Sequence, residues 1–273
     1  MLSCLVGSEM CIRDRYLGNP DLVVVMDSGG PDYDHIWKTD ALRGLIHGTL
    51  SVRVSKEGVH SGMAGGAIPS SFRIARILLD RIEDSRTGKI LIPSFHTEIN
   101  DSHVKTAGAI AEVVGESLWG SLPVVETLEP HNTDTAQMLL DVNWRPALSV
   151  IGAGGLPPVE SAGNVLRTHT DLALSLRIPP GVNSQKAMVE LTEILERDPP
   201  FGAEIKFEAH PPADGFRAPP LPPNVAEELE RVSNSLTGKP PHTTWVGGTI
   251  PFMAMMQSKS VSYTHLTLPT THD

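Results

Sequence analysis

Several stretches of the chain alternate hydrophobic and polar residues, which is the pattern of a strand with one buried face. This pattern predicts strands over residues 42–54, 172–178 and 203–207, and a short hydrophobic run predicts another over 148–151. Residues 22–26 are continuously hydrophobic, as in a strand that is buried on both faces. The chain therefore contains several strands of two different kinds.

Other stretches place hydrophobic residues at helical spacing. The clearest helix is predicted over residues 68–84, and further helices are predicted over 104–120, from Asp134, over 183–195 and within 224–257. The first of these carries a hydrophobic face made of Ile74, Ile77, Leu78 and Ile82. Asn183 stands where a helix N-cap is expected.

The order of these elements favours a particular fold. Strand, helix, strand followed by strand, helix, strand predicts a compact two-layer α+β sandwich with its helices on one sheet face. Pro211-Pro212 and the proline-rich run 218–223 indicate a rigid return to another part of the protein. We therefore expect the α+β segment to be inserted into a second domain.

Composition and charge narrow the possible partners. The chain has 273 residues and a formal net charge of −10, which argues against nucleic acid as a partner. No run of eighteen apolar residues occurs, so we expect no membrane span. Both cysteines, Cys4 and Cys11, lie near the N-terminus, which excludes disulfides and cysteine-zinc sites from the remainder.

The two ends of the chain are related at the level of DNA. Residues 10–14 can be encoded by ATGTGTATAAGAGAC, and the reverse complement of that string encodes Val-Ser-Tyr-Thr-His, the sequence of residues 261–265. An inverted repeat of this kind indicates a sequencing adapter that was read in frame. We therefore expect residues 1–15 and 261–273 to be foreign, to pack poorly and to add no site residue.

A glycine-rich loop over residues 58–69 carries the most informative chemistry. Its histidine, His60, lies between a predicted strand and a predicted helix, and four glycines allow the backbone to approach a ligand closely. An imidazole in such a place can donate to a developing anion. The alternative is a glycine-rich turn with an ordinary surface histidine.

Motifs around this loop resemble those of a known family. Asp27 ends the hydrophobic run and is followed by Ser28-Gly29-Gly30, and Leu42-Arg43-Gly44 precedes the histidine loop. Gly247-Gly248-Thr249-Ile250-Pro251 lies far downstream, and Trp144-Arg145-Pro146-Ala147-Leu148 resembles a segment of the dipeptidase branch. In order and spacing, residues 16–260 resemble the M20 family of zinc metallopeptidases, which includes carboxypeptidases, dipeptidases and deacylases.

The resemblance implies an α/β catalytic domain interrupted by an inserted α+β, two-layer, ferredoxin-like lid and dimerisation domain. The catalytic-domain fragments would be residues 16–40 and 213–260, and the lid would be residues 41–212. The chain would then be an internal fragment of a longer protein. The resemblance also implies a homodimer formed through the lid domain.

The resemblance assigns a metal ligand, Asp27, and a cofactor of two zinc ions per site. The other family ligands are a His-x-Asp, a bridging Asp, a Glu-Glu pair and a late His, and these would lie outside residues 16–260. The Glu-Glu pair also holds the general base. A turn carboxylate at the end of a strand is the alternative for Asp27.

The resemblance also assigns residues that contact substrate. His60 would be catalytic, reaching the neighbouring subunit's active site to stabilise the tetrahedral oxyanion. Asn164 and Arg177 would grip the substrate carboxylate, and Gly248 and Thr249 would line the pocket. Arg167 departs from the family, which often has proline there, and Arg177 could instead be a surface arginine. The other histidines show no metal-ligand spacing and are interpreted mostly as surface residues.

The leading hypothesis is a fragment of a zinc-dependent amide or peptide hydrolase, of dipeptidase or carboxypeptidase type, that uses metal-activated water. Its substrate would be a small peptide or an N-acyl amino acid. The alternative is a non-catalytic dimerisation or binding module derived from the same family. A third possibility, an unrelated anion-binding α/β protein, lacks a phosphate-loop motif. We expect a cytoplasmic location, and neither nucleic acid nor membrane as a partner.

Overall fold

The structure is a computed structural model that describes residues 22–259 and 263–267. The chain divides into two compact units. Unit 1 contains Met1–Ala41, Phe216–Trp245 and Phe252–Asp273, and unit 2 contains Leu42–Gly215 and Val246–Pro251.

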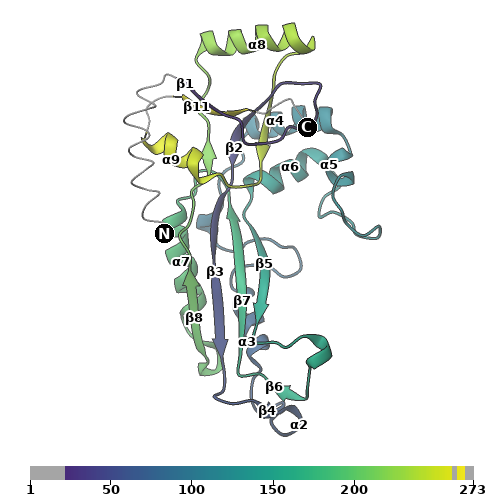
Figure 1. The fold of residues 1–273 in the computed structure, drawn as a ribbon. Coiled ribbons are helices and arrows are strands. Elements are labelled where there is room, and N and C mark those ends of the chain that lie inside the picture. Colours follow the sequence, from purple (N-terminus) through teal and green to yellow (C-terminus); the bar gives the residue numbers. More distant parts are fainter. Residues whose placement is uncertain (1–21, 260–262, 268–273) are drawn as a thin grey trace. The chain divides into compact units, whose positions relative to one another are not determined.

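Unit 2 is built on a four-stranded antiparallel sheet in the order β5-β7-β3-β8. Figure 1 shows the four strands side by side, with β3 and β7 in the middle. Their bounds are β3 Gly44–Arg53, β5 Ala147–Gly154, β7 His169–Ile178 and β8 Glu204–Ala209. The chain order strand-helix-strand, strand-helix-strand agrees with the predicted sandwich.

Alternation along the two central strands determines which face of the sheet is covered. Every second residue of β3 and β7 is buried, while the residues between them are partly exposed. Helices α3 (Ser71–Leu79) and α7 (Ser184–Glu196) both pack on the sheet and form a second layer on it. Ile46, Leu50 and Leu174 meet the helices in one core, where each such side chain contributes about 1.5–3 kcal/mol to stability.

Helices α3 and α7 of unit 2 begin at capping residues of types that the sequence makes recognisable. Ser70 accepts a hydrogen bond from the Arg73 amide at the start of α3, and Asn183 accepts one from the Lys186 amide at the start of α7. The cap predicted at Asn183 is therefore confirmed. Each cap satisfies a backbone donor that the helix itself leaves unpaired, which is typically worth about 1 kcal/mol.

Further helices follow in the region between β3 and β5. These are α4 (Asp101–Val114), α5 (Ser117–Gly120) and α6 (Thr135–Trp144), and α4 packs against α6. His103 of α4 stacks on Trp144 of α6 with ring centroids 3.9 Å apart. The single helical segment predicted over 104–120 is thus two helices, because Gly115 adopts a positive φ of 53° and ends α4.

A small ribbon continues the far end of the sheet (Figure 1). It pairs β4 (Val59–His60) with β6 (Val165–Leu166), and α2 (Ser61–Ala64) follows β4 directly. The remaining short turns of unit 2 are η2 (Pro93–Phe95), η3 (Val159–Ser161) and η4 (Pro200–Gly202).

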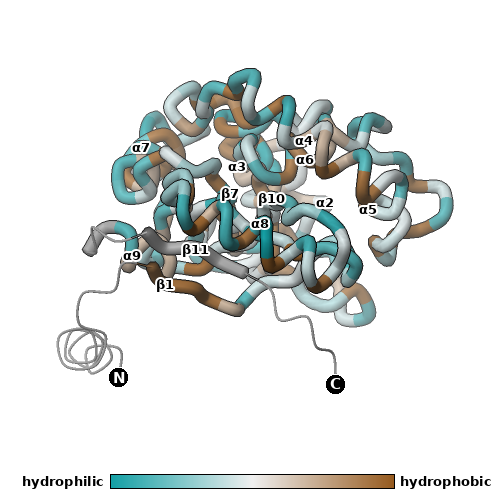
Figure 2. Tube along the Cα trace, turned by 90° about the horizontal axis from the view of Figure 1, so that it is seen from above, coloured by the Kyte–Doolittle hydropathy of each residue, from teal (hydrophilic) through white to brown (hydrophobic). Residues whose placement is uncertain are grey.

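Unit 1 contains a second sheet in which β1, β11, β2 and β10 are neighbours and β9 pairs with β2. The bounds are β1 Leu22–Val25, β2 Trp37–Leu42, β9 Phe216–Arg217, β10 His242–Val246 and β11 Tyr263–Thr267. The hydrophobic run of β1 appears as a brown segment in Figure 2. Helices α8 (Pro223–Thr237) and α9 (Pro251–Lys259) complete this unit.

Residues 263–267 do not follow the expectation that the C-terminal segment packs poorly. As β11 they pair in parallel with β1, Leu22 opposite Tyr263, and antiparallel with β2, Thr39 opposite Leu266. Strand pairing is made by backbone groups, so it needs no matched hydrophobic face, and tyrosine and threonine favour strands. The other residues of the two end segments lie outside the described part of the chain.

The fold class is confirmed in its coarse form, as a mixed α/β fold. Along the chain, unit 2 begins at Leu42 and its long segment ends at Gly215, while the division into catalytic-domain and lid segments stays a prediction. Among the described residues, no helix is both long enough and apolar enough to cross a membrane.

Candidate functional site

A polar site of unit 2 surrounds Arg177, near the C-terminal end of β7. Its Nη1 group donates to Thr249 Oγ1 at 2.8 Å, and Thr249 Oγ1 donates to the carbonyl oxygen of Arg43 at 2.6 Å. A hydroxyl has one proton, so its use on the Arg43 carbonyl leaves the oxygen lone pairs to face Arg177. The segment 246–251 is thereby attached to the sheet through one side chain.

Arg43 makes a second attachment to the same segment. Its Nε group donates to the Gly247 carbonyl oxygen at 2.9 Å. Gly247 has no space for a side chain, because a Cβ there would lie 3.0 Å from Arg43 Nη2 and 3.2 Å from the Val142 carbonyl oxygen. Burial, and the nearby Arg177 charge, lower the pKa of Arg43 to about 10.

Two histidines extend this group along the open face of the sheet. His47 lies two residues after Leu45, which is the strand partner of Arg177, and its ring centroid is 5.1 Å from that of His210. His47 Nδ1 is buried and has no hydrogen-bond partner among the described residues. Burial, His210 and Arg177 lower the pKa of His47, so that its ring is held neutral.

The charges of this group are one-sided. Arg43 and Arg177 approach closely enough to affect each other, and neither has an ion pair with a carboxylate within the described part of the chain. Two guanidinium groups side by side, one of them largely buried, favour a bound anion because it relieves both repulsion and desolvation. The arrangement suits a carboxylate, which the arginine fork can bind in bidentate fashion.

His60 and Asn164 lie together in the small ribbon. His60 is opposite Val165 in the β4–β6 pairing, and the Ser61 amide donates to the Asn164 carbonyl oxygen at 2.8 Å. The exposed His60 ring caps α2, because its Nδ1 accepts a hydrogen bond from the Gly62 amide at 3.1 Å. An imidazole that accepts at Nδ1 carries its proton at Nε2 when neutral, which leaves an N–H donor that points away from the cap.

The structure does not bring His60 and Asn164 to Arg177 and Thr249 in one chain. Arg177 is paired with Leu45 near the start of β3, whereas the ribbon continues from its other end, after Arg53. Eight residue steps separate Leu45 from Arg53, which at about 3.3 Å each is roughly 26 Å. Asn164 and Arg177 of the same chain therefore lie too far apart to contact one carboxylate, and their shared role in binding substrate stays a prediction.

Asp27, the expected metal ligand, follows β1 in unit 1 and is exposed. No group of three or more His, Cys, Asp or Glu side chains that could hold a metal ion occurs among residues 22–259 and 263–267. A protein zinc site needs three or four such ligands. The described residues therefore do not by themselves form a zinc site.

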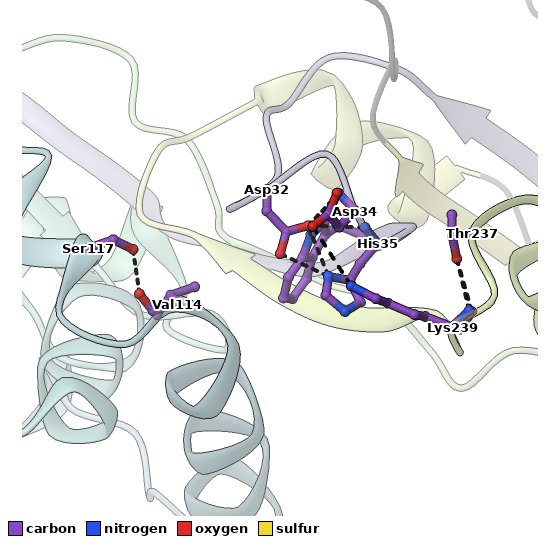
Figure 3. Close-up of polar contacts among 8 residues, drawn as sticks. Asp32, Asp34, His35, Val114, Ser117, Thr237 and Lys239 are labelled. Atoms are coloured by element: carbon purple, nitrogen blue, oxygen red, sulfur yellow. Dashed lines mark hydrogen bonds and ion pairs between the residues drawn. The ribbon is translucent and has the colours of Figure 1, made fainter.

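The loop after Asp27 is fixed by a separate polar cluster, shown in Figure 3. Asp32 accepts hydrogen bonds from His35 Nδ1 at 2.8 Å, from Trp37 Nε1 at 3.1 Å and from the Asp34 amide at 3.0 Å. Burial opposes the charge of Asp32, but the bonds from Trp37 and His35 outweigh it and lower its pKa. Because the donors are satisfied, we interpret this cluster as a structural anchor for the loop.

Sequence reasoning missed two members of the site on the sheet. Arg43 contributed to the family resemblance but received no role, and His47 was interpreted as one of the surface histidines. A signal for His47 did exist: the alternation of β3 places Leu45, His47 and Thr49 on the face away from the helices. That signal could not show that Arg177 lies on the neighbouring strand.

Comparison with solved structures shows what the fold resembles. Human carnosine dipeptidase 1 matches with a TM-score of 0.74 at 19% identity, covering 94% of this chain and 54% of that one. The dipeptidase Dug1p from Saccharomyces cerevisiae matches with a TM-score of 0.72 at 18% identity, covering 95% and 55%. The M20 family metallo-carboxypeptidase Sso-CP2 from Sulfolobus solfataricus matches at 0.69 and 14%, covering 94% and 58%.

These matches establish the fold. The chain has the α/β fold of the M20-type metallopeptidases and spans between half and three fifths of the length of these solved chains. No family model matches the sequence, and no curated protein matches it.

Proposed function

We propose that the chain is part of an M20-family amide or peptide hydrolase of dipeptidase or carboxypeptidase type. The observation that carries the proposal is the pair Arg43 and Arg177, joined through Thr249 and without a carboxylate partner among the residues that the structure describes. A dipeptide, or an N-acyl amino acid, ends in a free carboxylate that fits this arrangement. The fold of metallopeptidases supports the same conclusion.

Arg177 is the group that binds the substrate carboxylate in this proposal. Thr249 holds one arm of its guanidinium, which leaves the remaining donors for the ligand. Gly248 lies next to Thr249 and provides a backbone amide without a side chain in the way. Arg43 acts through Thr249 and Gly247, whose positions it fixes, and is therefore a positioning residue.

His60 serves the active site of a second subunit in this proposal, and Asn164 goes with it. The separation of the ribbon from Arg177 supports this division, since the two groups cannot act on one substrate within one chain. The Nε2–H of His60 is placed to donate to an oxyanion, a contact whose loss typically costs ~10²–10³ in turnover. Unit 2 would then be the inserted ferredoxin-like lid and dimerisation domain.

A homodimer through this domain is supported by the edge strand β5. Its residues 149–153 are exposed, and Ile151 and Val150 retain 67% and 47% of their accessible surface. An edge strand that presents hydrophobic residues and unpaired backbone groups is a template for pairing with another chain. A second copy could pair with it along the same strand.

The cofactor in the proposal is a pair of zinc ions, which would activate the attacking water in the whole protein. Asp27 would contribute one ligand, and the other ligands would come from parts of the whole protein outside residues 16–260. The described residues do not by themselves form a metal site.

The alternative, a non-catalytic dimerisation or binding module, is favoured by that same lack of a metal-binding group among the described residues. In such a module Arg177 and Thr249 could bind a carboxylate without hydrolysing anything. A measurement of catalysis in the whole protein separates the two.

The test uses the full-length protein encoded by the intact gene. His60→Ala and Arg177→Ala should each abolish nearly all dipeptide hydrolysis, the first through kcat and the second through KM. When the two inactive variants are mixed and allowed to exchange subunits, half of the dimers carry one complete site, so roughly a quarter of the activity should return. Loss of activity with a chelator is the accompanying measurement.

Each result has a defined meaning. If the mixture stays inactive although subunits exchange, His60 does not act across the dimer. If the full-length protein shows no chelator-sensitive hydrolysis of any dipeptide or N-acyl amino acid, the hydrolase proposal is wrong and the binding module remains. Arg177→Lys, which keeps the charge but not the fork, should raise KM for substrates with a free carboxylate more than for their amides.

A further inference from the structure

A cavity of about 280 Å³ lies at the end of unit 2 that is remote from Arg177. It is enclosed by the end of β3, the segment leading into α3, and the turn that precedes β8. Its apolar lining includes Val54, Ile68 and Ile74, the last of which belongs to the core and is fully buried. This volume is near the lower end of the range of small-molecule sites, so a ligand of about the size of one amino acid fits it.

The turn on one side of the cavity is held in an unfavourable backbone conformation. Asp198 and Phe201 have positive φ angles of 45° and 56°, which residues with a side chain rarely adopt. Arg81 holds the start of this turn, because its guanidinium donates to the carbonyl oxygens of Arg197 at 2.6 Å and Asp198 at 2.7 Å. The hydrogen bonds from Arg81 therefore stabilise this backbone conformation.

The turn exposes Phe201, whose side chain adds little to the packing of the chain. Phe201 lines the cavity and retains 71% of its accessible surface, so its ring gains little from packing within the chain. A glycine at the same place would adopt the positive φ without strain. Strained residues of this kind persist where the surrounding structure over-determines them, and they cluster at sites that hold ligands. If the Phe201 ring covered a bound molecule, the contact would offset both the backbone strain and the exposure of the ring.

The rim of the cavity selects the charge of that molecule. Arg53 and Lys56 contribute two positive charges and Glu204 one negative charge, which leaves a net charge of +1 at the rim. Neither Arg53 nor Lys56 has an ion pair within the part of the chain that the structure describes. A positive rim above an apolar floor favours an anion with an apolar body, because the local charge attracts the anion and the floor buries its apolar part.

We propose that this cavity is a binding site for a small organic carboxylate with an aromatic or branched aliphatic body. The apolar body lies on the floor formed by Val54, Ile68 and Ile74, and the Phe201 ring covers it. The carboxylate faces Arg53 and Lys56. The site is separate from Arg177 and does not depend on the hydrolase proposal.

The test is a binding titration of the chain with 3-phenylpropionate, monitored by ligand-observed NMR or calorimetry. The uncharged analogue 3-phenylpropionamide is the control ligand. The acid should bind saturably and at least fivefold more tightly than the amide. Arg53→Gln and Lys56→Gln should each weaken the acid at least threefold and leave the amide within a factor of two. Arg86→Gln, which removes an exposed cation outside the cavity, should change neither ligand.

Phe201→Gly separates binding from folding. It should weaken the acid at least tenfold, while its thermal midpoint stays equal to that of the parent chain or rises, because glycine relieves the strain at φ 56°. The proposal is overturned if the parent chain shows no saturable binding, if acid and amide bind equally, or if Phe201→Gly binds as tightly as the parent.

Discussion

At the scale of single residues, Thr249 connects parts of the chain that are far apart in the sequence. Its hydroxyl donates to the backbone of Arg43 and accepts from Arg177, so one side chain fixes both the loop 246–251 and the guanidinium. The Thr249 hydroxyl restricts the orientation of the Arg177 guanidinium more than a solvent-exposed ion pair would, because both of its hydrogen bonds have defined directions. The orientation of Arg177 therefore depends on a neutral residue.

We predict that Thr249→Val destabilises the chain by about 1–3 kcal/mol, because it removes two hydrogen bonds, one of them from a charged donor. Thr249→Ser keeps the hydroxyl and should cost less than about 0.5 kcal/mol, as a substitution that preserves both bonds. Urea unfolding curves of the three proteins measure the difference. A larger loss in Thr249→Ser than in Thr249→Val would mean that the methyl group, and not the hydroxyl, is what matters.

His47 makes stability depend on pH. Its folded-state pKa is lowered by burial, by His210 and by Arg177, while the unfolded value is near 6.5. The unfolded chain therefore binds more protons, so the stabilisation is fully present above about pH 6.5 and is lost as pH falls through the folded pKa. His242, whose pKa is lowered by burial and by His35, acts in the same direction.

Accordingly, His47→Gln should lose less stability than the parent chain between pH 7.5 and pH 5. Thermal midpoints at the two pH values give the comparison. Thr49→Ala, on the same face of β3 and without a titratable group, should keep the full pH dependence of the parent. If His47→Gln is as acid-sensitive as Thr49→Ala, the buried imidazole does not contribute.

The sequence indicated His60 and Arg177 for different reasons. His60 stands in a glycine-rich loop whose composition is unusual enough to notice, and Gly62 explains part of it, since a Cβ there would lie 3.2 Å from the imidazole. Arg177 could be singled out only through the family resemblance, because an arginine on an alternating strand is otherwise unremarkable. The distance between His60 and Arg177 depends on the register of the strands, which could not be predicted from the sequence.

At the scale of elements, strands and helices with a strong period were predictable. The predicted strand over 42–54 corresponds to β3, and the predicted strand over 172–178 corresponds to the C-terminal part of β7, because both alternate buried and partly exposed residues. The ribbon of β4 and β6 was missed, since each strand has two residues and no period can show. β10 and β11 were missed because their pairing is made by backbone groups with strands distant in the sequence.

Two glycines, one in β3 and one in α4, should respond to alanine in opposite ways. A Cβ at Gly48 would lie 2.6 Å from the Glu208 carbonyl oxygen and 2.7 Å from the Phe207 ring, so Gly48→Ala should destabilise by about 1–3 kcal/mol. Gly108 has open space and lies within α4, so Gly108→Ala should stabilise by about 0.5–1 kcal/mol. Denaturant midpoints provide the test, and a stabilised Gly48→Ala would contradict the close approach of β8 to β3.

At the scale of the whole molecule, the division into two units follows from the path of the chain. Unit 1 is assembled from three separate segments, while unit 2 is formed largely by one continuous segment. Hydrophobic periodicity predicted the main strands of unit 2, and the proline-rich run at 218–223 predicted a return to another part of the protein. Neither pattern could place β11 between β1 and β2, since residues 22–25 and 263–267 are separated by almost the entire chain.

The last prediction concerns metal binding and activity of the 273-residue chain itself. Asp27 is one carboxylate, and zinc is held tightly by three or four protein ligands, so the chain should bind zinc weakly. Calorimetric titration should give nearly the same weak isotherm for the parent chain and for Asp27→Asn. Dipeptide hydrolysis should be undetectable, because the catalytic base that typically supplies ~10²–10⁴ in rate is expected in a Glu-Glu pair that lies outside residues 16–260. Chelator-sensitive hydrolysis by the chain alone would show that it contains a complete metal site, and the division of ligands proposed here would then be wrong.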